Sequence, residues 1–144
     1  MGGGEALEKT WPWQVALRLR DGGKIFCGGT LISSNFVLSA SHCFEQVRKN
    51  DIFLSAGHLS KVWYSDKKRF LKFHFFFKKY RSGSKEPGFQ QFLAKQIIMH
   101  DQYDPNVIYA DIALVKVSGN FKITEYVKER SRKLKIFILC ISNA

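Results

Sequence analysis

One short segment of this 144-residue chain holds residue types that acyl-transfer chemistry uses. In Leu38-Ser39-Ala40-Ser41-His42-Cys43, a histidine follows an apolar stretch and precedes a cysteine. A general base for acyl transfer is an imidazole held at the edge of a rigid sheet, with one nitrogen free to take a proton. A cysteine that can bridge to another strand would hold His42 in such a place. Taken alone, however, a histidine beside a cysteine is more often structural than catalytic.

The cysteines also limit what other chemistry is open to the chain. There are three, Cys27, Cys43 and Cys140, so at most one internal disulfide can form and one thiol is left over. One histidine with one or two cysteines offers too few ligands at a recognisable spacing for a zinc site. We therefore expect no metal. We also expect no cofactor.

The surrounding sequence has the pattern of short β-strands separated by turns. In residues 13–20, apolar Trp13, Val15, Leu17 and Leu19 alternate with mostly polar residues, and Asp21-Gly22-Gly23 is a turn signal that predicts a hairpin. Further strands are expected at 24–26, 30–32, 36–38, 51–56, 96–99 and 111–117. This spacing predicts an all-β antiparallel sandwich or barrel.

Several of these segments resemble the trypsin/chymotrypsin family of serine endopeptidases. Leu38 through Cys43 is similar to the family's histidine signature, Trp11-Pro12-Trp13-Gln14-Val15 to its first strand, and Cys27-Gly28-Gly29 to the partner of the signature cysteine. The resemblance covers residues 2–60 strongly and 95–127 moderately. It implies the first of the family's two six-stranded antiparallel β-barrels, with a Cys27–Cys43 disulfide and His42 as general base.

The resemblance also assigns a role to Asp111. Ala110-Asp111-Ile112-Ala113-Leu114 resembles the family segment Asn-Asp-Ile-Ala-Leu, which supplies the carboxylate that orients the catalytic histidine. Without that context, Asp111 would be interpreted as an ordinary turn or strand-start aspartate.

The nucleophile of the family has no counterpart in the sequence. No serine lies in a Gly-Asp-Ser-Gly-Gly segment, and the second barrel that carries this segment in the family is expected to be absent. The resemblance implies a truncated serine-type endopeptidase that is inactive alone and would act on a protein or peptide substrate if completed by the missing half.

Charge suggests an alternative function. The chain has 23 basic and 12 acidic residues, a net charge of +11. Nine basic residues and one acidic residue between Lys61 and Lys85 contribute +8 of it. This segment is either a solvated basic loop or a surface for a polyanion such as heparin or nucleic acid, in which case the chain is a non-catalytic binding module.

The sequence predicts one domain region and a tail. Residues 1–127 form the N-terminal part of the peptidase domain, with an irregular basic and phenylalanine-rich insertion near 61–91, and residues 128–144 form a divergent tail. Residues 1–6 lack the layout of a signal peptide, and no stretch is apolar enough to span a membrane. The family and its disulfide nevertheless imply an extracellular, secreted protein.

Overall fold

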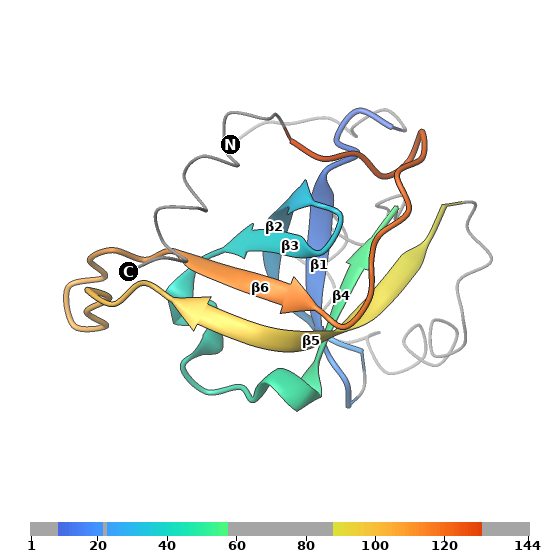
Figure 1. The fold of residues 1–144 in the computed structure, drawn as a ribbon. Coiled ribbons are helices and arrows are strands. Elements are labelled where there is room, and N and C mark those ends of the chain that lie inside the picture. The colour runs from blue at the N-terminus through green and yellow to red at the C-terminus, as the bar shows by residue number, and fades with distance from the viewer. Residues whose placement is uncertain (1–8, 22, 58–87, 131–144) are drawn as a thin grey trace, which may run out of the picture.

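The computed structural model describes residues 9–21, 23–57 and 88–130. Within these ranges the chain forms six strands, which are β1 (Gln14–Leu19), β2 (Ile25–Ser33), β3 (Phe36–Ser39), β4 (Ile52–Ala56), β5 (Gln90–Met99) and β6 (Ala113–Val117). All pairings are antiparallel, and the strands close into a barrel in the order β1-β2-β3-β6-β5-β4 (Figure 1). The predicted all-β, six-stranded antiparallel barrel is confirmed.

The two hairpins at the start of the barrel follow the local sequence. β1 pairs with β2 across the predicted turn, where the Leu19 amide donates to the Lys24 carbonyl at 2.9 Å. Ser34 and Asn35 then reverse the chain into β3. In β1, Val15 and Leu17 are fully buried, as their alternation predicts, while Leu19 at the end of the strand is only half-buried.

β5 pairs with a different neighbour along each half of its length, and this helps to close the barrel. β5 pairs with β4 through Gln90–Leu93 and with β6 through residues 94–99, with a register shift between Ala94 and Gln96. Such an irregularity bends a strand and increases its local twist, which lets one strand serve two neighbours. Figure 1 shows β6 lying between β3 and β5.

One continuous core fills the barrel. Its fully buried side chains come from several strands and from the segment after β6, and include Leu17, Leu31, Val37, Ile52, Leu54, Val115, Phe121 and Val127. The ring of Phe121 packs edge-on against Phe92 of β5, with centroids 4.9 Å apart. The chain after β6 is therefore part of the barrel's packing.

Some sequence predictions fall wholly or partly outside the described residues. Most of the basic insertion (58–87) and residues 131–144 of the tail lie outside them. At the edges of these regions, Gln90 and Gln91 belong to β5. The Lys128 amide donates to the Pro12 carbonyl at 2.9 Å, and the Arg130 amide donates to the Leu31 carbonyl at 2.8 Å.

Candidate active site

The candidate base lies on a short 3-10 helix, η1 (Ser41–Phe44), directly after β3. Phe44 is 5% exposed and packs into the core, while the fully buried Ser41 hydroxyl donates to the Ile112 carbonyl at 2.7 Å. Cys43 forms the expected disulfide with Cys27 of β2, and their Cα atoms are 6.2 Å apart. Three separate attachments therefore fix the turn that carries His42.

The register of β3 and β6 brings His42 and Asp111 to the same rim of the barrel. Ser39, the last residue of β3, pairs with Ala113, the first residue of β6. In an antiparallel pair the end of one strand lies beside the start of the other. His42, just after β3, and Asp111, just before β6, therefore leave the sheet at the same edge.

A tight turn presents Asp111 to that edge. Ala110 has a φ of 50°, in the left-handed region, and its carbonyl accepts the Ile112 amide at 2.8 Å. Non-glycine residues seldom adopt this conformation, and side chains such as asparagine tolerate it best. The carboxylate is thus held in place by a backbone conformation that alanine disfavours.

The two candidate side chains are in direct contact. His42 Nδ1 lies 2.6 Å from Asp111 Oδ2, and the His42 backbone amide donates to Asp111 Oδ1 at 2.8 Å. Burial by itself raises the pKa of Asp111. The hydrogen bonds from the His42 amide and imidazole, the imidazole charge and the Ser41 amide outweigh it, so the pKa is lowered below its ordinary value.

This contact decides which ring nitrogen is free. An ionised carboxylate only accepts hydrogen bonds, so the proton of a neutral imidazole lies on Nδ1 and Nε2 keeps its lone pair, with Cys43 Sγ 3.6 Å away. The His42 side chain is 53% exposed, and Asp111 is 20% exposed. The arrangement leaves Nε2 as the ring atom that can take a proton.

Two further contacts near the site were not predicted from the sequence. The buried Ser41 bond ties the histidine turn to the residue after Asp111. The Tyr103 hydroxyl bonds Glu45 and so ties the β5–β6 loop to the end of η1, and that bond, with burial and nearby negative charge, raises the Tyr103 pKa to about 12. No residue pattern in the sequence signals either contact.

The serines around His42 have other partners. Ser39 donates to the Gly28 carbonyl at 2.8 Å, and Ser41 donates to Ile112. Among the residues that the structure describes, no serine hydroxyl is hydrogen-bonded to the His42 ring.

The other histidine that the structure describes, His100, lies in the β5–β6 loop and pairs with Asp101 at 3.0 Å.

An antiparallel six-stranded barrel with a carboxylate-bound histidine and a neighbouring disulfide at one rim defines the class of trypsin-like peptidase barrels. The sequence matches the family model described as Trypsin over residues 1–84 and 47–133, and the chain belongs to this family.

One curated relative is the human protein Transmembrane protease serine 11B, which is 30% identical over 128 residues. The match covers 88% of this chain and 24% of the relative, so the chain spans about a quarter of that protein's length. Within the described part of the chain, no helix is long and apolar enough to cross a membrane.

Proposed function

We propose that this chain contributes the general base and its orienting carboxylate to a serine-type endopeptidase that cleaves protein or peptide substrates. The observation that supports the proposal is the double contact of His42 with Asp111, at 2.6 Å through Nδ1 and 2.8 Å through the backbone amide. Membership of the trypsin family supports the reaction class.

In the proposed reaction, His42 Nε2 takes the proton of a serine hydroxyl as that oxygen attacks the scissile carbonyl. The same nitrogen then gives the proton to the leaving amine, and an acyl-enzyme remains for water to hydrolyse. Asp111 keeps the ring in the required tautomer and stabilises the imidazolium. The disulfide supports an oxidising, extracellular setting, where such bonds persist.

The nucleophile has to come from outside these 144 residues, because their sequence contains no Gly-Asp-Ser-Gly-Gly segment. A fluorophosphonate probe should leave the purified chain unlabelled, and peptide ester hydrolysis should equal that of a His42→Ala variant. Stoichiometric labelling of a serine would contradict this assignment.

A chimera tests the roles of the two residues. In it, the chain is continued by the part of the human relative's peptidase domain that carries its nucleophilic serine, and disulfide mapping checks that the Cys27–Cys43 barrel has formed. Ester hydrolysis should be abolished by His42→Ala and lowered on the order of 10⁴-fold by Asp111→Asn. His100→Ala is the matched control and should retain activity. Equal activity of the His42→Ala chimera would contradict the proposal.

The basic segment supports a second candidate function, polyanion binding by a non-catalytic module. Its nine basic residues and single acidic residue lie between Lys61 and Lys85, outside the described ranges. Binding through these charges should fall steeply with salt. Retention on heparin that disappears when Lys67, Lys68 and Arg69 become glutamine would support it, and unchanged retention would contradict it.

A further inference from the structure

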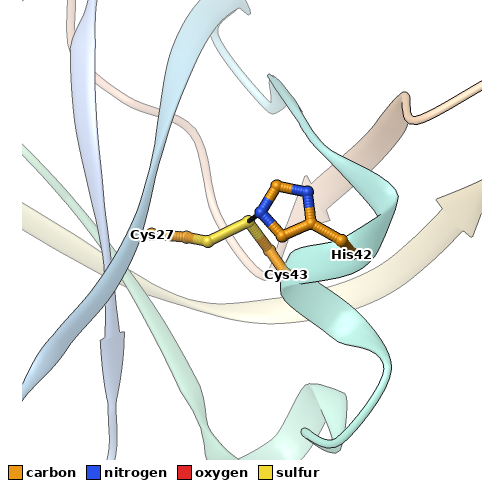
Figure 2. A group of neighbouring side chains, drawn as sticks. All are labelled: Cys27, His42 and Cys43. Atoms are coloured by element: carbon orange, nitrogen blue, oxygen red, sulfur yellow. Dashed lines mark hydrogen bonds between the residues drawn. A yellow bond between two sulfur atoms is a disulfide. The ribbon is translucent and has the colours of Figure 1, made fainter. Parts of the chain in front are cut away.

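Beside the candidate base lies a group of side chains with the donor set of a zinc site. One ligand atom each from Cys27, His42 and Cys43 lies within 4.8 Å of the others. Figure 2 shows the His42 ring beside the Cys43 end of the disulfide, with a ring nitrogen facing the Cys43 sulfur. In the oxidised chain both sulfurs are bonded to each other, so the group holds no thiolate.

We propose that, once this disulfide is reduced, Cys27, Cys43 and His42 Nε2 bind one Zn²⁺ ion. Two thiolates and one imidazole are preferred zinc ligands, and three protein ligands leave a fourth position for water. From the sequence we expected no metal site, because one histidine with one or two cysteines offers too few ligands at a recognisable spacing. The structure places the three donors together.

The distances fit a tetrahedral ion. Zinc lies about 2.3 Å from sulfur and about 2.0–2.1 Å from nitrogen, so two such ligands at a tetrahedral angle are about 3.5 Å apart. The separation of Cys43 Sγ and His42 Nε2 is 3.6 Å. The two sulfurs must part to about 3.8 Å, which side-chain rotation allows because their Cα atoms are 6.2 Å apart.

The surroundings of His42 favour binding through Nε2. Asp111 Oδ2 already accepts the Nδ1 proton at 2.6 Å, and such a carboxylate fixes the ring of a zinc-bound histidine and makes it a stronger ligand. The half-exposed imidazole leaves a path for the ion from solvent. The carboxylate that orients the proposed base would therefore also support the metal.

The reaction balances with a dithiol as reductant. The dithiol gives two electrons and two protons to the disulfide and becomes a disulfide itself, and zinc then displaces the protons of Cys27 and Cys43. Disulfide and zinc are mutually exclusive states of the same sulfurs. In the zinc state, Nε2 is no longer available for the proton transfer in the proposed function, although the binding itself does not depend on that function.

The test is zinc titration of the full chain, reduced with a phosphine under anaerobic conditions, against a chromophoric chelator. We expect one Zn²⁺ per reduced chain at this site and none there in the oxidised chain. His42→Ala should weaken zinc affinity at least about 10-fold, and Asp111→Asn about 10–100-fold. Asp101→Asn, beside His100, is the matched control and should leave the affinity unchanged.

Alkylation provides a second measurement that does not depend on the variants. Zinc should slow iodoacetamide modification of Cys27 and Cys43, located by peptide mass mapping.

The Asp111→Asn variant distinguishes the folded site from chelation by an unfolded chain. Asp111 is 69 residues from His42, so this substitution can change zinc affinity only where the fold brings the two residues together. Equal affinity of the wild-type and Asp111→Asn chains, or equal alkylation rates with and without zinc, would overturn the proposal.

Discussion

His42 contacts both oxygens of the Asp111 carboxylate, one through its imidazole Nδ1 and the other through its own backbone amide. The two residues are thereby fixed in orientation as well as in distance, since a carboxylate held at both oxygens cannot rotate without losing a bond. The backbone contact further links Asp111 to the η1 turn itself, so the pair is part of the barrel's rim and contributes to its stability.

That link predicts a pH-dependent stability. The pKa of Asp111 is lower in the folded chain than its value of 3.8 in a free side chain. A lowered carboxylate pKa stabilises the fold above the unfolded pKa, and this contribution is lost as pH falls through the folded pKa. Urea unfolding from about pH 5 to about pH 2 should show this loss in the wild type and lack it in Asp111→Asn. Parallel curves for the two proteins would contradict the coupling.

The left-handed conformation of Ala110 predicts a stabilising substitution. Its φ of 50° is disfavoured for alanine and tolerated by asparagine, so Ala110→Asn should raise the free energy of unfolding by about 0.5–1 kcal/mol. Ala110→Val is the opposing control, because a β-branched side chain fits this region worst. Thermal melts of the three proteins should rank Asn above Ala above Val, and any ranking with Val highest would disprove the strain.

Gly29 should resist substitution because β2 and β3 approach closely there. A Cβ at this position would lie 2.6 Å from Val37 Cγ1 and 2.8 Å from the Leu38 carbonyl oxygen. The carbonyl belongs to the backbone of β3 and cannot move aside, so Gly29→Ala should cost about 1–3 kcal/mol. Chemical denaturation measures the loss. A neutral Gly29→Ala variant would show that the strands can separate at this point.

The disulfide should contribute measurably to stability. Cys27 and Cys43 are 16 residues apart, and closing a loop of this size is worth about 3 kcal/mol in the chain-entropy account. Replacing both cysteines with serine should lower stability by that order in urea unfolding. Mass mapping of the non-reduced chain should find these two cysteines cross-linked and Cys140 free to alkylate. A bridge from Cys140 to either of them would contradict the pairing.

Local patterns predicted the early part of the fold well. The alternation of Val15 and Leu17 and the turn at residues 21–23 depend on neighbouring residues, and β1 and β2 form there. The closure of β1 on β4 and of β3 on β6 joins distant segments. The family resemblance predicted a six-stranded barrel, but neither it nor local alternation predicted which distant strands pair. The start of β5 at Gln90 was not expected, because two polar glutamines join a strand there only through their pairing with β4.

The candidate site was also predicted only in part. Sequence motifs that resemble those of the family predicted His42 and Asp111 as site residues and the pairing of Cys27 with Cys43. The positive φ of Ala110, the buried Ser41 bond and the approach of Cys43 Sγ to Nε2 depend on three-dimensional packing that no motif encodes. The role of His42 as a base remains a proposal, and its first requirement is a particular protonation state of the ring.

The most direct test is therefore the tautomer of His42, measured by ¹⁵N–¹H NMR of the oxidised chain with labelled histidine at a pH where the ring is neutral. His42→Ala assigns the signals. We predict a proton on Nδ1 and a bare Nε2 in the wild type, and loss of this preference in Asp111→Asn. A wild-type ring protonated on Nε2, or a tautomer that Asp111→Asn leaves unchanged, would contradict the account of Asp111 as the group that prepares His42 for proton transfer.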